Sequence, residues 1–217
     1  MAREQTSKDE YYTILGSDGK FRLTVPEGTA GSVKREYEDS AGVKGVKNEL
    51  VFDKLSGKIT NVAFHDGKFG KSLQITLTDE VGPMVISLNT ATNFGEDAMK
   101  KLPNIDRSKV VSFNPYAFTD DKGKLRKGIS IVQDGQKITN YFYDEAEKKN
   151  LHGFPTPKGD TKKYSKDKWK IYFLEAREFL VEYITEHFTE GAVPAIDPNT
   201  DDADALADSL SALPDEQ

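Results

Sequence analysis

The sequence SGKITNVAFHDGKFGKSLQITLTDEVGPMVISLN, residues 56–89, decides the fold. It contains three short segments rich in β-branched residues, which is a composition typical of β-strands. Between them lie stretches with Gly and Asp, residue types that tolerate the positive φ angles of hairpin turns. The segments are residues 56–64, 71–79 and 83–89. This stretch therefore predicts three consecutive antiparallel strands.

The second segment shows the clearest alternation of apolar and polar residues. Leu73, Ile75 and Leu77 are separated by Gln74 and Thr76. In a strand the three aliphatic side chains share one face, because successive side chains point to opposite sides of a sheet. We expect this face to be buried and the face with Gln74 to be exposed.

A short helix is predicted after the third strand. Residues 92–105 offer Thr92 or Asn93 as an N-cap, acids in the first turn, lysines in the last turn and Pro103 as a stop. Further strands are predicted at residues 109–118, 125–133 and 137–143.

This order of elements favours one fold. Three strands, a helix and two more strands is the order of the OB-fold, a five-stranded Greek-key barrel that binds oligonucleotides across strands two and three and along its loops. The sequence therefore predicts a mainly β protein whose residues 51–145 form an OB-fold-like, five-stranded antiparallel barrel, with a short helix between strands 3 and 4.

The flanking regions complete the expected domain plan. Residues 1–50 read as extra N-terminal strands packed on the barrel, with a hairpin at 11–25. Residues 146–163 are expected to form a basic loop. Residues 164–190 predict a long C-terminal amphipathic helix, with Ser165 as N-cap. The face expected to pack on the body carries Trp169, Phe173, Ala176, Leu180, Tyr183 and His187. Residues 191–217 are expected to be a disordered acidic tail.

Composition and motifs argue against several function classes. The chain has no Cys and three His, which excludes disulfides and thiolate zinc sites and leaves little for any metal centre. No nucleotide-binding, zinc-protease or nucleophile-elbow motif occurs. The acidic pair Asp120 and Asp121 lies in an expected hairpin tip, where carboxylates are usually solvated. We therefore expect no enzyme activity, no metal and no cofactor. No apolar run is long enough for a membrane span or a signal peptide, so an intracellular, membrane-free location is expected.

The charge is unevenly distributed along the chain. The formal net charge is −6, but residues 197–217 hold seven acids and no Lys or Arg. The preceding 196 residues therefore carry a net charge of +1, and within them residues 148–170 carry +6. A negative average thus conceals a basic body region that could contact a polyanion.

Aromatic residues interleaved with lysines occur around the expected hairpins, the pattern by which proteins hold single-stranded nucleic acids. Phe118 is one of these aromatic residues. For each of them, the pattern is equally consistent with a side chain packed in the core and with one that binds nucleic acid. The strand 137–143 is expected to project both of its tyrosines to one face. The candidate DNA-binding residues are Phe64, Lys68, Phe69, Lys71, Gln74, Tyr116, Lys122, Lys124, Arg126, Lys127, Tyr141 and Tyr143.

The acidic tail predicts two roles. A tethered polyanion can occupy a basic groove weakly until DNA displaces it, and a released tail can recruit other proteins. Leu206, Leu210 and Leu213 have helix-like spacing, which favours docking on a partner. A solubilising tail without any partner is the alternative. The candidate partner-binding residues are Asp201, Asp202, Asp204, Asp208, Asp215 and Glu216.

Several segments resemble one family. SVKREYED, VKNELVFDKLSGKI, NFGEDAMKKLPNID, NPYAF, QKITNYFYD, GFPTPK and KWKIYFLEAREFLVEY, which span most of residues 32–190, look like single-stranded-DNA-binding proteins of bacteriophages. That family pairs an OB-fold core with an acidic C-terminal tail that contacts replication and recombination proteins.

The resemblance implies a specific function. It implies sequence-tolerant binding that coats and protects single-stranded DNA in phage DNA replication or recombination, in the cytoplasm of an infected bacterium. The partners would be single-stranded DNA and, through the tail, replication or recombination proteins. The alternative is an OB-type protein-interaction module of the replication machinery that does not bind DNA directly, which the near-neutral body favours. A Mg²⁺-dependent nuclease is a third hypothesis, disfavoured by the lack of an acidic cluster outside the tail.

Overall fold

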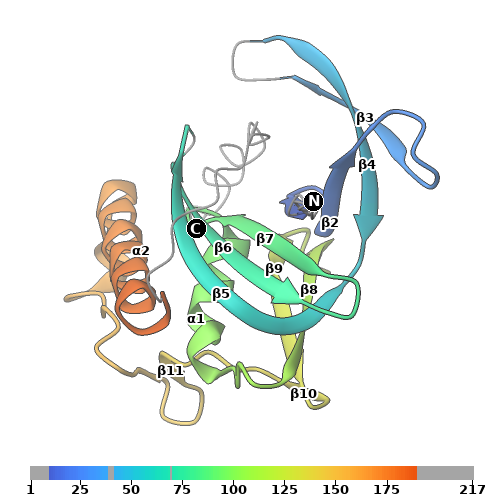
Figure 1. Cartoon of the computed structure of the whole chain (residues 1–217). Helices are drawn as coiled ribbons and strands as arrows, with labels where there is room; N and C mark the ends of the chain where they lie inside the picture. The colour runs from blue at the N-terminus through green and yellow to red at the C-terminus, as the bar shows by residue number, and fades with distance from the viewer. Residues whose placement is uncertain (1–9, 39–41, 69, 190–217) are drawn as a thin grey trace.

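The computed structural model describes residues 10–38, 42–68 and 70–189, and one large mixed β-sheet dominates them (Figure 1). The sheet has ten strands in the spatial order β10-β9-β8-β5-β6-β7-β1-β2-β4-β3. These strands are β1 (Glu10–Leu15), β2 (Lys20–Val25), β3 (Val33–Glu38), β4 (Lys44–Phe52), β5 (Leu55–Gly67), β6 (Gly70–Thr78), β7 (Pro83–Asn89), β8 (Val110–Thr119), β9 (Leu125–Gln133) and β10 (Gln136–Lys137).

The central strands follow the predicted order. Strands β5, β6 and β7 form consecutive antiparallel pairs, α1 (Asn93–Lys101) follows β7, and β8 returns to pair with β5. The spatial order β8-β5-β6-β7 is that of a Greek key. The predicted short helix is confirmed, and Thr92 is its N-cap, accepting a hydrogen bond from the Gly95 amide at 3.2 Å.

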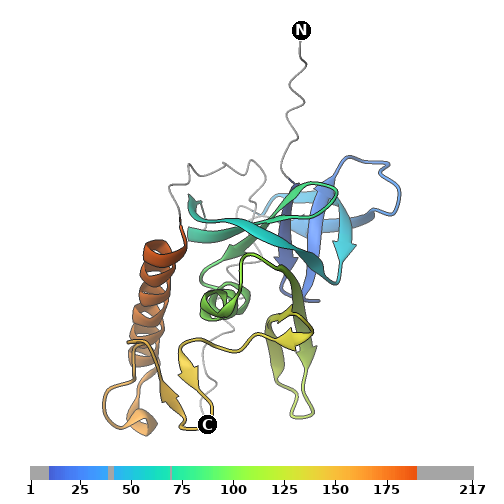
Figure 2. The same cartoon turned by 60° about the horizontal axis from the view of Figure 1, so that its bottom comes forward.

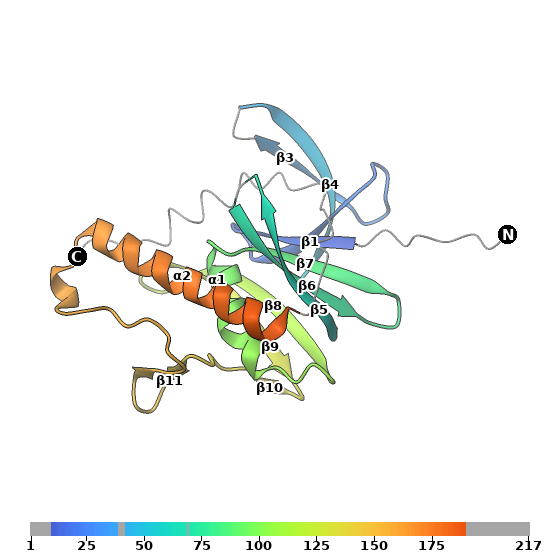
Figure 3. The same ribbon diagram turned by 60° about the vertical axis from the view of Figure 1, so that its left-hand side comes forward.

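The sheet does not close into a barrel in the described residues, and it is not purely antiparallel. Strand β7 pairs with β1 in parallel, with Tyr12 opposite Ile86, instead of closing on β9. The N-terminal strands therefore continue the central sheet. Beyond them, β3 and β4 form an arm that extends away from the central strands (Figures 1 and 3). Pairing between such distant segments leaves no local mark in the sequence.

Strand β5 is long and strongly curved, and a bulge divides it. Its register against β6 shifts between Ile59 and Asn61. Before the bulge Leu55 and Ile59 face the core, whereas after it Val62 and Phe64 do. An extra residue in one strand reverses which side chains point inward, and it increases the local bend.

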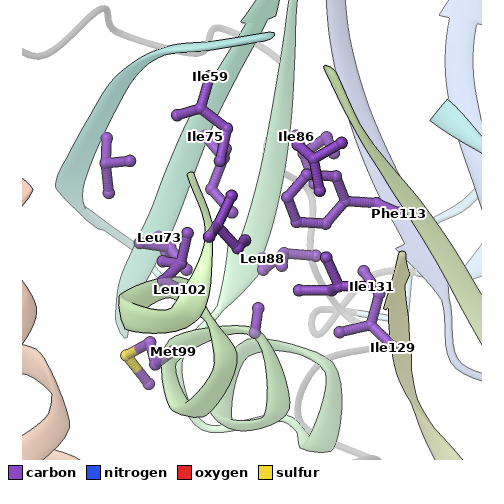
Figure 4. Close-up of a cluster of buried hydrophobic side chains, with 14 of the residues drawn as sticks. Ile59, Leu73, Ile75, Ile86, Leu88, Met99, Leu102, Phe113, Ile129 and Ile131 are labelled. Carbon is purple, nitrogen blue, oxygen red and sulfur yellow. The ribbon is translucent and has the colours of Figure 1, made fainter. Parts of the chain in front are cut away.

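The main core lies between the curved sheet and α1 (Figure 4). Side chains from β5, β6, β7, β8 and β9 meet Met99 of α1 and Leu102 of the following 3₁₀ turn, η1 (Leu102–Asn104). A buried polar link fixes the helix to the sheet. Lys101 donates to the carbonyl oxygen of Ile129 at 2.6 Å and pairs with Asp97, which accepts from the Ile129 amide at 2.8 Å.

The C-terminal helix α2 (Lys166–Phe188) packs beside α1 (Figures 2 and 3). Ser165 caps it as predicted, accepting from the Lys168 amide at 3.3 Å. Its buried residues are Ala176, Leu180 and Ile184, so the predicted inward stripe is confirmed in its middle. His187 lies on the exposed side and stacks on Tyr183, with ring centroids 4.2 Å apart.

The predicted strand at 137–143 is wrong. Strand β10 pairs with β9 only at Gln136–Lys137, the Ile138 amide still donates to the Ile131 carbonyl oxygen at 2.8 Å, and residues 139–142 leave the sheet. The chain then forms a two-stranded ribbon of β11 (Tyr143–Asp144) and β12 (Lys149–Asn150) and a 3₁₀ turn, η2 (Thr161–Lys163), before α2. The basic segment 146–163 thus contains some regular structure. No described helix is long and apolar enough to cross a membrane.

Candidate nucleic-acid interface

The β8–β9 hairpin gathers aromatic and basic side chains at one end of the sheet. The register sets Tyr116 opposite Gly128 and Phe118 opposite Arg126, so these four residues share a face. Phe118 is 55% exposed, and its ring centroid lies 5.8 Å from that of Tyr116. An exposed ring of this kind is suited to stack on a nucleobase, although the Arg126 guanidinium beside it is already paired with Asp120.

Asp120 organises the turn of this hairpin. Its carboxylate accepts the backbone amides of Lys122 and Lys124 at 3.0 and 2.9 Å and the Nε of Arg126 at 2.8 Å. The hydrogen bond from the Lys124 amide, followed by that from the Arg126 side chain, lowers the pKa of Asp120 below its ordinary value. Lys122 and Lys124 are exposed. The turn therefore presents two lysine side chains on a backbone held by a carboxylate.

Tyr116 is more constrained than its neighbour Phe118. A Cβ placed on Gly128 would lie 2.5 Å from the Tyr116 hydroxyl oxygen, so the phenol lies against the glycine. Burial, and then the charge of Asp97, raise the pKa of Tyr116. Gly19 of the β1–β2 turn also approaches the strand so closely that a Cβ there would lie 2.3 Å from the Ala117 nitrogen. These contacts fix the base of the hairpin.

The β5–β6 hairpin differs from this arrangement. Phe64 is half-buried and packs against the hydrophobic core, because the bulge in β5 turns it inward. Lys71 forms an ion pair with Asp66 at 2.8 Å across the hairpin. Lys68 is exposed, and Phe69 lies outside the described residues. Among the described candidates of this hairpin, the one aromatic residue, Phe64, is turned toward the core and offers no exposed ring beside the lysines.

Gln74 has the predicted orientation but not the predicted exposure. It points away from the face of Leu73 and Ile75, between Ala63 and Ser87 of the neighbouring strands, yet it is only 5% exposed. Its Nε2 atom is buried and forms no hydrogen bond with any of the described residues. The second face of the central sheet is thus largely buried here, contrary to the expectation of a solvated face.

Tyr141 and Tyr143 do not share an exposed strand face. Tyr141 stacks on His152 with centroids 3.9 Å apart, and its hydroxyl accepts a 3.3 Å hydrogen bond from Tyr183 of α2. Burial, and then this hydrogen bond, raise the pKa of Tyr183 to about 12. Tyr143 is half-buried in β11, opposite Asn150. The predicted pairing of these tyrosines as a stacking platform is wrong, because residues 139–142 turn under α2.

The candidate residues therefore form separate groups. Strand β5 begins beside Phe113, in the middle of β8, and runs away from the β8–β9 turn, so the β5–β6 turn lies at its far end. The figures show the two hairpin tips apart (Figures 2 and 3). The β8–β9 group is the one that the structure brings together: Tyr116, Phe118, Lys122, Lys124 and Arg126. The remaining candidate of this hairpin, Lys127, is opposite Ala117 and lies on the other face.

A second basic and aromatic cluster was not among the predicted site residues. Lys168 lies over the ring of Tyr164, with its Nζ 4.1 Å from the centroid, and Tyr164 contacts Trp169 at a centroid distance of 5.0 Å. The signal that could have located it is the run of lysines between 158 and 170 around these aromatics.

No group of three or more acidic or imidazole side chains that could hold a metal ion occurs in the part of the chain that the structure describes. The acidic residues of the expected partner-binding tail, Asp201 to Glu216, lie outside the described residues. No protein-family model, curated protein or solved structure matches the chain.

Proposed function

We propose that this protein binds single-stranded DNA with little sequence preference, and that the β8–β9 hairpin is a principal contact. The observation that carries the proposal is the exposed Phe118 ring beside Arg126, next to a turn that presents Lys122 and Lys124. Binding to any single strand needs a stacking surface and cations along the backbone path, and this hairpin has both.

The topology supports this assignment. In OB-folds the connection between the fourth and fifth strands is one of the loops that contact oligonucleotides. Strands β5 to β9 have the Greek-key order and the helix position of that fold, and β8–β9 is the corresponding connection. We infer an OB-like core that is open where β7 pairs with β1.

The resemblance to phage single-stranded-DNA-binding proteins supplies the proposed setting. The protein would coat and protect unwound strands during replication or recombination in the infected cell. Its acidic C-terminal residues would recruit other replication proteins.

A second candidate function is a protein-interaction module of the same machinery. The observation that favours it is the β3–β4 arm, where Val33, Val43 and Val46 are 46%, 61% and 57% exposed. Val33 lies on the edge strand β3, Val46 lies on β4 and Val43 precedes β4. Exposed aliphatic side chains on a hairpin at the edge of a sheet are suited to a protein partner.

A gel-shift titration separates the candidates. We expect labelled oligo-dT to be shifted, the same sequence as a duplex to bind more weakly, and Mg²⁺ to cause no cleavage. The full-length chain with Phe118→Ala should bind more weakly, whereas Val110→Ala, which removes another exposed side chain (54% exposed), should not. No shift of oligo-dT at low salt would reject DNA binding and favour the interaction module. Cleavage that requires Mg²⁺ would favour a nuclease.

A further inference from the structure

The first turns of α2 carry aromatic rings that contact one another. The Trp169 ring stacks on Phe173 with centroids 5.6 Å apart, and it lies 5.0 Å from the ring of Tyr164 in the preceding loop. Trp169 and Tyr164 are half-buried, so each ring keeps part of its surface exposed to solvent. The side chains of α2 that pack against the main core come later in the helix, from Phe179 onward. The rings at its start therefore form a separate group.

Lysines surround these rings. Residues 158–170 include six lysines and two acids, a net charge of +4. The Nζ of Lys168 lies over the Tyr164 ring, 4.1 Å from its centroid. Within the part of the chain that the structure describes, four of the six lysines form no ion pair: Lys158, Lys162, Lys166 and Lys168. The rings thus lie among positive charges that have no acidic partner there.

The turn before α2 is ordered in the same way as the turn of the β8–β9 hairpin. Asp160 accepts a hydrogen bond from the Lys162 amide at 3.1 Å, as Asp120 does from the Lys122 amide at 3.0 Å. The Tyr164 hydroxyl donates to a backbone carbonyl oxygen of the loop before it at 2.7 Å. In both places a carboxylate orders a turn that presents lysines beside an aromatic ring.

Helix formation does not explain the lysines at the start of α2. Cations are unfavourable near the N-terminus of a helix, where the positive end of its dipole lies. Lys166, Lys168 and Lys170 nevertheless occupy the first two turns, and Asp167 is the acid of the first turn. These positive charges repel one another and the helix dipole, and a bound anion would offset this repulsion.

We propose that a group of five residues is a second contact for single-stranded DNA. We call it the α2 cluster, and it consists of Lys158, Lys162, Tyr164, Lys168 and Trp169. A base would stack on the exposed part of the two rings, and the lysines would contact the phosphates beside it. The inference rests on the proposed function, because it assigns a further part of the path of the same strand.

The α2 cluster and the tip of the β8–β9 hairpin lie apart (Figures 2 and 3). One bound strand would therefore contact both places, and each contact would raise the effective concentration of the strand at the other. Loss of either contact should weaken binding without abolishing it.

Trp169 is the only tryptophan of the chain, so its emission reports on the α2 cluster. A base stacked on the indole quenches this emission. We expect oligo-dT to quench it saturably, at the concentrations at which the anisotropy of labelled oligo-dT rises. Inorganic polyphosphate, a polyanion without bases, should quench much less at the same ionic strength. The full-length Phe118→Ala variant should still show the quenching, at higher concentrations of oligo-dT.

Two substitutions of Trp169 separate stacking on a base from packing on Phe173. Trp169→Leu keeps an apolar side chain but removes the ring, and it should weaken oligo-dT binding about fivefold or more. Trp169→Phe keeps a ring and should weaken it about twofold at most. Ile171→Ala, at an exposed residue on the other side of the same turn, should leave the affinity unchanged. Thermal unfolding of each variant verifies that it is folded.

The lysines of the α2 cluster have their own readout. Lys162→Ala with Lys168→Ala should make the slope of log K for oligo-dT against log salt less steep by up to about 1.4. An unchanged slope would exclude both lysines from the contact.

The results that would overturn this inference differ from those that would overturn the proposed function. No binding of oligo-dT to the wild-type protein would reject both. Binding that Phe118→Ala weakens, with Trp169 emission unchanged and Trp169→Leu without effect, would reject the α2 cluster alone. Equal losses in Trp169→Leu and Trp169→Phe, or quenching by polyphosphate as strong as by oligo-dT, would also reject base stacking there. A loss in Trp169→Leu but not in Phe118→Ala would support the α2 cluster and reject the β8–β9 contact.

Discussion

The two hairpins β5–β6 and β8–β9 have similar sequences of aromatic and basic residues, but their side chains are placed differently. In β8–β9 the strand keeps its alternation to the tip, so Phe118 remains exposed beside Arg126. In β5 the bulge near Thr60 reverses the alternation, so Phe64 joins the core. An aromatic residue next to lysines therefore indicates a binding surface only when it is known which face of the strand its side chain is on.

The cations of the two hairpins differ in the same way. Lys71 is paired with Asp66, whereas Asp120 binds mainly backbone amides and Arg126 and leaves Lys122 and Lys124 without an acidic partner among the described residues. Asp120 therefore orders its turn and leaves the positive charges of the two lysines on the surface, whereas Asp66 neutralises the charge of Lys71. The following four predictions test this contrast.

The largest expected effect is on stability. Phe64→Ala removes a ring that packs against the core, and we expect the free energy of unfolding to fall by about 3 kcal/mol. This corresponds to a melting temperature roughly 6–12 °C lower for a chain of this size. Thermal unfolding followed by circular dichroism measures it. Unchanged stability with weakened DNA binding would show that Phe64 belongs to the binding surface after all.

Phe118→Ala should show the reverse behaviour. Loss of an exposed stacking ring should weaken oligo-dT binding by about 1–3 kcal/mol, or roughly five- to 150-fold. Because the side chain is more than half exposed, the melting temperature should stay within about 2 °C of the wild-type value. Fluorescence anisotropy of a labelled oligonucleotide gives the affinity. A stability loss as large as that of Phe64→Ala would mean that the two hairpins do not differ.

The third prediction concerns the lysines. Each phosphate contact contributes roughly −0.7 to the slope of log K against log salt for single strands. Lys122→Ala with Lys124→Ala should therefore make the slope less steep by up to about 1.4. Lys71→Ala should leave it nearly unchanged, because Lys71 is already paired. Titrations at four salt concentrations suffice. Equal slopes for the two variants would contradict the assignment of the contact to β8–β9.

The smallest effect is a pH dependence of the β8–β9 turn. The pKa of Asp120 is lowered from 3.8, so the ordered turn is stabilised above that pH, and this contribution is lost as pH falls through the lower folded-state value. The amide resonances of Lys122 and Lys124 should stay constant from pH 7 to about 5 and shift together below about pH 4. In Asp120→Asn this shared shift should disappear. Titration of these amides near pH 6 would rule out Asp120 as the cause.

Much of the fold could be predicted from local patterns. The N-terminal hairpin, the five central strands, and the caps Thr92 and Ser165 are all confirmed, because each depends on residues close together in sequence. The open sheet could not be predicted, since the parallel pairing of Tyr12 with Ile86 joins segments more than seventy residues apart. The bulge in β5 also has no turn residue to mark it.

The candidate site was predictable to a smaller extent. The β8–β9 basic residues were identified from their turn, but Tyr141 was misjudged because its neighbours His152 and Tyr183 come from distant parts of the chain. Phe118 was noted among the aromatic residues but was not selected as a candidate. In the structure the hydroxyl of Tyr141 accepts a hydrogen bond from Tyr183 of α2.

The parallel β1–β7 pair has a consequence for how the protein is made. At a synthesis rate of roughly 5–20 residues per second, β7 follows β1 by about 4–15 s, and for that time β1 has no parallel neighbour. During this time β1 is held only by β2, in a hairpin whose turn is closed by a 3.0 Å hydrogen bond from the Lys20 amide to Asp18. Asp18 also pairs with Arg22, so the contacts within the hairpin are all local. The N-terminal hairpin can therefore form before β7 is synthesised. The pairing of β7 with β1, which closes the long loop between them, then determines when the sheet becomes continuous.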